Sequence, residues 1–203
     1  MASFVHLHVH SYFSLLDGCA SPTALAQAAA QAGMPALALT DHDALYGAIE
    51  FYDACRQQGI QPILGMELTL DTNSSLPDSL VLLARNMEGY ANLCRLSSAV
   101  QTRPDREVRS QRGLHVDKLE GHCGGLIALS GGKRGRLDRL VRAGQKQQAA
   151  AVAAGWSERF GRESFFIEVQ IQELGDAEVA SGLAALADSQ GLFTVATNNV
   201  HYL

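Results

Sequence analysis

Short apolar runs alternate with amphipathic stretches along most of the chain. The apolar runs predict six buried strands, at residues 36–40, 62–68, 80–84, 126–130, 165–169 and 193–197. Apolar residues at helical spacing predict helices at 22–33, 45–58, 88–99, 136–142, 145–160 and 176–189. The segment 102–124 breaks the alternation and is expected to be irregular. Strands joined by helices indicate a parallel sheet with helical crossovers.

The N-terminal residues show a different alternation, in which histidines separate the apolar positions. A strand over residues 4–9, continued one residue further, places His6, His8 and His10 on one face and apolar residues on the other. Histidines on a covered face of a sheet need specific partners. Neutral imidazole is the commonest metal ligand in proteins, so this seventh predicted strand is expected to carry a metal site.

Seven strands with crossover helices indicate an α/β barrel that is closed or nearly closed, with one domain over residues 1–203. The chemistry of such barrels lies at the C-terminal ends of the strands. Polar residues fall at those ends here, and they are His10, Asp17, Asp41, His42, Glu67 and His201. We therefore expect these side chains to converge.

Histidine nitrogens combined with carboxylate oxygens suit zinc, manganese or iron better than calcium. Neighbouring metal ions can clamp a phosphate, activate a water and stabilise the leaving oxygen. Glu67 is the best candidate for a carboxylate that bridges two ions. The pattern predicts a metallohydrolase, such as a phosphoesterase, and leaves its substrate open.

Composition narrows the classes of partner. The net charge is −5, so contact with nucleic acid would depend on a local patch or on a larger protein. One run of basic residues could form such a patch, and its members are Lys133, Arg134, Arg136, Arg139 and Arg142. The alternative, which is slightly favoured, is that these residues form a solvated face of a helix.

Four cysteines without CxxC spacing favour reduced thiols in a cytoplasmic protein. No secretory signal and no apolar run of membrane-spanning length is found, so no membrane contact is expected.

Several motifs resemble the polymerase and histidinol phosphatase (PHP) family. They are His6-Leu7-His8-Val9-His10-Ser11 with Ser14-Leu15-Leu16-Asp17-Gly18, Leu39-Thr40-Asp41-His42, Pro62-Ile63-Leu64-Gly65-Met66-Glu67, and Ala196-Thr197-Asn198-Asn199-Val200-His201-Tyr202. Within that family, the chain resembles the N-terminal PHP domains of bacterial DNA polymerase III alpha subunits, through Leu82-Leu83-Ala84-Arg85-Asn86 and Gly125-Leu126-Ile127-Ala128-Leu129-Ser130-Gly131. The resemblance covers essentially the whole chain and implies a distorted TIM-like (β/α)7 barrel with a polynuclear metal centre.

The resemblance also implies a set of site residues. The implied metal ligands are His8, His10, Asp17, His42, Glu67 and His201, with His8, His10 and Glu67 as the catalytic residues. His6 and Asp41 are expected to support ligand histidines from behind.

Three positions depart from the family pattern. Ser79 replaces a ligand histidine, Gly132 replaces a frequent cysteine, and Asn199 replaces an aspartate and is a weaker ligand. Asp78 is an alternative to Ser79, but in a regular strand it faces the opposite side. We therefore expect the site to bind fewer than three divalent ions, which would be zinc or manganese.

The resemblance leaves two functional interpretations within a longer polymerase chain. One is a metal-dependent phosphoesterase or 3′–5′ exonuclease, and the other is a structural support for the polymerase. The partners implied are the remainder of the polymerase chain, DNA and a proofreading subunit. A free-standing PHP phosphatase acting on a small phosphorylated metabolite is the alternative. The chain ends two residues after His201, which favours a fragment of a longer chain.

Overall fold

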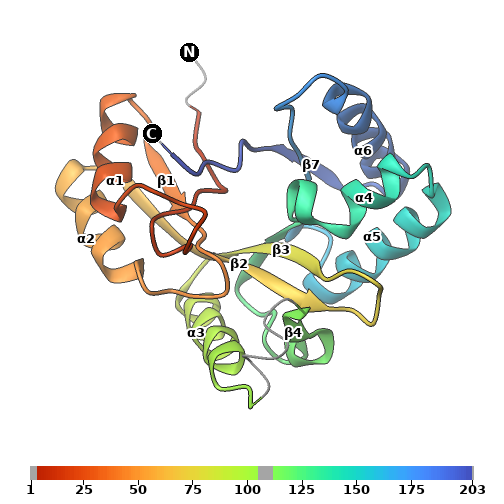
Figure 1. Ribbon diagram of the computed structural model, residues 1–203, viewed down its shortest axis with the longest axis horizontal. Coiled ribbons are helices and arrows are strands. Elements are labelled where there is room, and N and C mark those ends of the chain that lie inside the picture. The colour runs from red at the N-terminus through yellow and green to blue at the C-terminus, as the bar shows by residue number, and fades with distance from the viewer. Residues whose placement is uncertain (1–3, 105–111, 203) are drawn as a thin grey trace.

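A curved sheet with helices on its outer side forms the fold (Figure 1). The computed structural model describes residues 4–104 and 112–202. Its elements are α1 (Pro22–Gln31), β1 (Ala36–Leu39), α2 (Ala48–Gln58), β2 (Gln61–Asp71), β3 (Asp78–Ala84), α3 (Met87–Gln101), β4 (Leu114–His115), η2 (Val116–Leu119), β5 (Leu126–Leu129), η3 (Gly132–Arg134), α4 (Arg136–Arg142), α5 (Lys146–Phe160), β6 (Phe165–Val169), α6 (Asp176–Gln190) and β7 (Phe193–Ala196). The six apolar runs are therefore strands, as predicted.

The sheet has the strand order β1-β2-β3-β5-β6-β7, and β4 pairs with β2. Pairing is parallel except at β3, which runs antiparallel to both β2 and β5. The expectation of a wholly parallel sheet is wrong at this strand. A short turn rather than a helix joins β2 to β3, so the chain reverses direction. As a result, the start of β3 lies at the rim where the parallel strands end.

The predicted first strand is wrong as a regular strand, although the segment lies where a strand would. Val9 forms an isolated parallel bridge with Val200, and His10 N–H donates to the Val200 carbonyl at 2.8 Å. On its other side, the Thr40 hydroxyl takes part in the pairing. It accepts from Val9 N–H at 2.9 Å and donates to the Val9 carbonyl at 3.0 Å. The segment thus joins β1 to the chain that follows β7, beside which it lies in Figure 1.

Alternation along β3 shows how the core is divided. Leu80 and Leu82 belong to the large cluster packed under α3 to α6, whereas Val81 and Leu83 point to the concave side with Ala38. Both clusters consist of apolar side chains, so the polar residues of these strands gather at the rim.

The segment expected to be irregular contains two short elements, β4 and η2, in its described part, and residues 105–111 lie outside the described residues. In the described part of the chain, the helices are too short or too polar to cross a membrane.

Candidate metal centre

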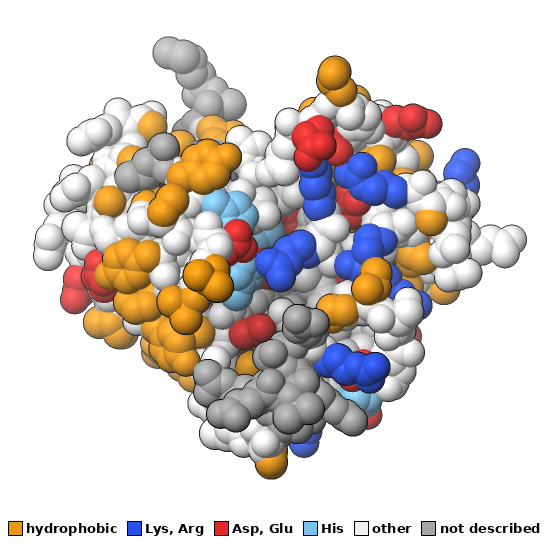
Figure 2. All heavy atoms as spheres, in the orientation of Figure 1, with side chains coloured by type: hydrophobic (Ala, Val, Ile, Leu, Met, Phe, Trp, Pro, Cys, Tyr) orange, Lys and Arg blue, Asp and Glu red, His pale blue; other side chains and the backbone are white. Residues whose placement is uncertain are grey.

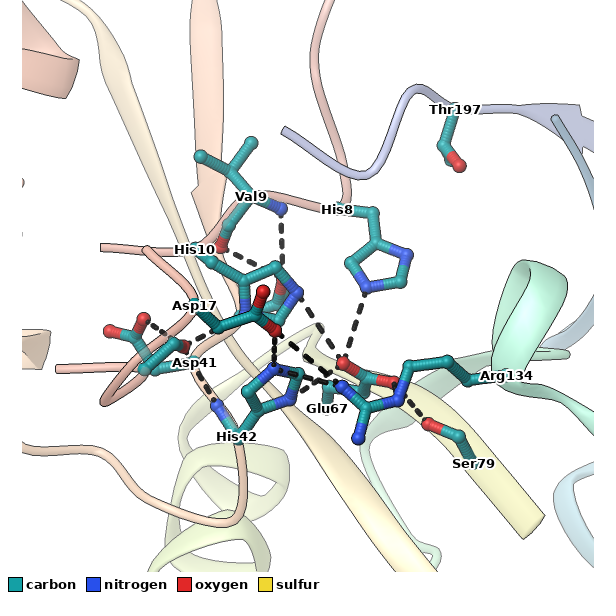
Figure 3. A network of polar contacts seen from close by, with 12 residues as sticks. His8, Val9, His10, Asp17, Asp41, His42, Glu67, Ser79, Arg134 and Thr197 are labelled. Atoms are coloured by element: carbon teal, nitrogen blue, oxygen red, sulfur yellow. Dashed lines mark hydrogen bonds and ion pairs between the residues drawn. The ribbon is translucent and has the colours of Figure 1, made fainter. Parts of the chain in front are cut away.

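Three imidazole rings converge on one carboxylate oxygen at the rim of the sheet (Figure 3). The Glu67 Oε2 atom lies 3.7 Å from His8 Nε2, 3.4 Å from His10 Nε2 and 2.7 Å from His42 Nδ1. His8, His10 and Glu67 are each no more than 1% exposed. Ligand atoms of these three residues lie within 4.8 Å of one another, close enough to share one ion.

The converging atoms are buried, and among the described residues they meet carboxylate or imidazole groups as ion pairs without a well-aligned hydrogen bond. They are His8 Nε2, His10 Nε2, His42 Nδ1, Glu67 Oε2 and His201 Nδ1. Buried polar atoms in native proteins are nearly always hydrogen-bonded, so a cluster of atoms without well-aligned hydrogen bonds needs an explanation. Imidazole lone pairs and a carboxylate oxygen are ligands of zinc and related ions. The residues present therefore fit a divalent metal ion.

Glu168 orients the ring of His8. Its Oε1 lies 2.7 Å from His8 Nδ1 and also accepts hydrogen bonds from the Thr197 hydroxyl and, at 3.1 Å, from Gln170 Nε2. A carboxylate only accepts, so Nδ1 carries a proton and Nε2 faces Glu67. Glu168 was missed from the sequence. The available signal was one charged residue in the otherwise apolar strand β6, because a buried carboxylate requires a partner.

A second relay orients His10. Ser14 Oγ donates its proton to Asp41 Oδ1 at 2.7 Å, so Ser14 Oγ in turn accepts from His10 Nδ1 at 2.9 Å. Nε2 of His10 is thereby directed to Glu67. Asp41 was expected to support a neighbouring histidine, and its contact runs through Ser14 to His10. The other predicted supporting residue, His6, packs edge-on against Phe4 with ring centroids 4.8 Å apart.

The outer part of the cluster is more open. Asp17 is 40% exposed, and its two oxygens lie 2.7 Å from His42 Nε2 and 3.2 Å from His201 Nδ1. The His201 ring stacks on His10 with centroids 4.6 Å apart. The structure thus brings all six predicted ligands together, although they come from segments throughout the chain. Their role as ligands stays a prediction.

The buried side chains of the cluster differ in how burial and neighbouring charges shift their pKa values. Burial alone would lower the pKa of His8, but the carboxylates of Glu168 and Glu67 outweigh it and raise the pKa to about 10. Burial lowers the pKa of His10 to about 2, so this ring is neutral. Burial opposes ionisation of Glu67, yet close contact with His42 and His8 holds its pKa well below the usual range. An ionised carboxylate therefore lies against a neutral imidazole with a free lone pair.

At the first departure from the family pattern, Ser79 stands where the resemblance implies a ligand histidine, and its side chain is a hydroxyl. Ser79 Oγ donates to Glu67 Oε1, as Figure 3 shows. The Asp78 carboxylate instead accepts from the backbone N–H groups of Ser79 at 2.8 Å and Arg136 at 2.6 Å. Asp78 therefore caps the start of α4.

The other two departures differ in how far they can be reversed. A Cβ atom at Gly132 would lie 2.5 Å from the Gln170 side-chain amide, and the backbone φ of +53° disfavours any residue with a side chain. A cysteine there would displace Gln170. Asn199 also has a positive φ, +47°, which asparagine and aspartate tolerate, and its Oδ1 is buried without a partner.

The basic run is not a continuous free surface. Lys133 pairs with Asp176 at 2.9 Å and with Glu173 at 3.0 Å, and Arg142 pairs with Asp176 at 2.8 Å. Arg139 donates to backbone carbonyls, including that of Pro77 at 2.7 Å. Arg134 turns toward the cluster of histidines and carboxylates. A phosphate-binding patch formed by all five side chains is therefore not supported.

Comparison with known proteins identifies the class to which this fold and site belong. The family model described as the PHP domain matches residues 6–172, so the chain belongs to the PHP family. The chain is similar to DNA polymerase III subunit alpha of Bacillus subtilis (36% identity) and Treponema pallidum (39%), and to an error-prone DNA polymerase of Symbiobacterium thermophilum (41%). These matches cover 98% to 99% of this chain but only 18% to 19% of each relative.

Solved structures support the fold. An amidohydrolase from Chromobacterium violaceum matches with a TM-score of 0.69 and 17% identity, over 98% of this chain and 87% of that one. A proposed metal-dependent phosphoesterase from Bifidobacterium adolescentis matches with a TM-score of 0.55 and 19% identity, over 99% of this chain and 88% of that one. The expected α/β barrel-like class is thus confirmed.

Proposed function

We propose that this chain is the PHP domain, residues 1–203, of a bacterial replicative DNA polymerase alpha subunit that acts in the cytoplasm. Relatives 36% to 41% identical over nearly the whole chain are polymerases, and they are about five times longer than the matched region. The remainder of the polymerase chain is then its main partner. This length favours the polymerase interpretation over a free-standing phosphatase.

We further propose that the domain retains a metal-dependent phosphoesterase site, with 3′–5′ cleavage of DNA as the reaction to test first. The observation that carries this proposal is the convergence of buried imidazole nitrogens, which lack well-aligned hydrogen bonds, on Glu67 Oε2. His8, His10 and Glu67 would hold one zinc or manganese ion, and Asp17, His42 and His201 would supply the outer ligands. Bound there, such ions stabilise negative charge on a phosphate and lower the pKa of water.

The residues of the chain prepare this site in three ways. Glu168 and Ser14 fix the rings of His8 and His10 so that each Nε2 faces inward. Burial keeps His10 neutral and therefore able to donate its lone pair. Close contact with histidines keeps Glu67 ionised.

Three substitutions argue for fewer than three ions. Ser79 and Gly132 offer no imidazole or thiolate, and the Asn199 amide oxygen is neutral. If the remaining ligands bind an ion without catalysis, the domain is a structural support in which the ion stabilises the barrel rim.

The experiment combines metal analysis with nuclease assays on the purified protein. Zinc and manganese are counted by mass spectrometry, and cleavage of single-stranded DNA is compared for the wild type, His8→Ala and Glu67→Ala. Both variants should lose metal and activity. His115→Ala is the matched control, because this exposed histidine contacts Asn73 and Asp117.

Each outcome bears on a different part of the proposal. Activity that survives both substitutions would show that this site is not responsible for cleavage. A full complement of three ions, or none, would contradict the expected partial occupancy. Metal without cleavage would leave the structural interpretation.

A further inference from the structure

The guanidinium group of Arg134 contacts three of the predicted metal ligands, His42, Asp17 and Glu67. Its Nη1 is 3.1 Å from His42 Nε2 and 3.6 Å from Asp17 Oδ2, and its Nε is 3.7 Å from Glu67 Oε1. Figure 3 shows the side chain reaching across the rim between Glu67 and Ser79 toward His42. In Figure 2, pale-blue histidines are visible at the centre of the face, with basic side chains beside them.

The backbone around Arg134 is fixed by a tight glycine turn. Gly131 has φ +79°, and a Cβ atom there would lie 2.1 Å from the Ser79 carbonyl oxygen. Gly135 N–H closes the turn on the Gly131 carbonyl at 3.1 Å, and Arg139 donates to the Arg134 carbonyl. The guanidinium is therefore brought to the rim by a specified backbone.

We propose that Arg134 sets the metal affinity of the outer half of the site by holding a permanent positive charge on atoms that a divalent ion would use. This inference rests on the proposed metal site, but it does not require that the site cleave anything.

Two physical arguments support it. First, arginine stays protonated at all physiological pH values and has only donors, so it can never become a metal ligand. Second, His42 Nε2 and Asp17 Oδ2 are contacted by the guanidinium and are also predicted ligand atoms. An ion that takes those atoms must displace the guanidinium and then lie near a like charge.

The effect should differ between the two halves of the site. The inner histidines are directed by Glu168 and Ser14, and the contacts of their Nε2 atoms are with Glu67. An inner ion therefore competes with the guanidinium only through Glu67. The guanidinium is 52% exposed, so water screens part of the repulsion and keeps the penalty moderate.

The test measures binding of Mn²⁺ or Zn²⁺ alone, by competition with a chromophoric chelator. Arg134→Gln and Arg134→Met remove the charge and should tighten the weaker of the bound ions about tenfold. Arg136→Gln is the matched control, because it removes the same charge two residues away on α4. Its affinities should stay within about twofold of the wild type.

Affinity that is unchanged or weaker in both Arg134 variants would overturn the proposal. Binding of one ion with the same affinity in every variant would overturn it as well. Thermal unfolding in EDTA establishes that the variants are folded, and agreement between the Gln and Met variants excludes an effect of one new side chain.

The result is separable from that of the nuclease assay. Tighter metal binding without cleavage in any variant supports the role of Arg134 and contradicts the proposed phosphoesterase. Cleavage of DNA, combined with metal affinities that are unchanged in the Arg134 variants, supports the proposed phosphoesterase and contradicts the role of Arg134.

Discussion

Replacing Glu168 by glutamine tests how the buried carboxylate prepares His8. Three donors, from His8, Gln170 and Thr197, all reach the same oxygen, Oε1. A glutamine amide oxygen can take that place and keep all three hydrogen bonds. Glu168→Gln therefore removes the charge and preserves the geometry.

The size of the effect follows from that geometry. In Glu168→Gln, the hydrogen bond that orients His8 becomes neutral, which costs about 1 kcal/mol. The affinity for the metal ion should therefore fall roughly fivefold. Glu168 and His8 are each about 1% exposed, so solvent screening does not reduce this figure. Glu168→Leu removes the acceptor for all three donors, and metal affinity should then fall roughly 10- to 100-fold.

The assay is metal competition with a chelator, with nitrogen NMR of the His8 ring as a second readout. Glu163→Gln is the control, because it makes the same change in charge at an exposed position. In Glu168→Leu the proton is no longer fixed on Nδ1, so the ring should populate the other tautomer. Metal affinity unchanged in both Glu168 variants would refute the idea that Glu168 orients a ligand.

Two further predictions concern other parts of the molecule. Asn199→Asp adds a negative charge at a buried, unpaired oxygen and should strengthen metal binding in the chelator assay, whereas weaker binding would show that this oxygen does not face an ion. Burial raises the pKa of the Cys55 thiol to about 11, from 9.0. The unfolded chain ionises first, so the free energy of unfolding should fall between pH 9 and pH 11, by at most about 1.4 kcal/mol per pH unit. Urea unfolding across that range should show a shallower fall in Cys55→Ala, and identical slopes would contradict the assignment.

Much of the fold could be predicted because burial dictates the apolar runs. The direction of β3 was missed, although no helix is predicted between residues 68 and 80 and so short a connection favours antiparallel pairing. The first segment alternates like a strand, but the Thr40 hydroxyl makes hydrogen bonds that a neighbouring backbone would otherwise make. A side chain that takes the place of backbone hydrogen bonds between strands cannot be recognised from the hydrophobic pattern of the sequence.

The candidate site could be predicted as far as ligand chemistry is local. His8, His10 and Glu67 were identified from residue type and position, and the structure brings them together. Glu168 was missed because its role depends on pairing between distant segments. Arg134 was assigned to a surface patch because its spacing in sequence does not reveal the turn that aims it at the site.

The pairing of Val9 with Val200 has a consequence for how the protein folds. This contact joins residues separated by nearly the whole chain, so its loop-closure entropy is among the largest in the molecule. Contacts of such high contact order are expected to form late, after the sheet from β1 to β7 is in place. His8, His10 and His201 flank this contact, so the cluster of predicted ligands would be complete only when folding is complete. The rate at which a metal ion is taken up during refolding would then report the rate of the last folding step.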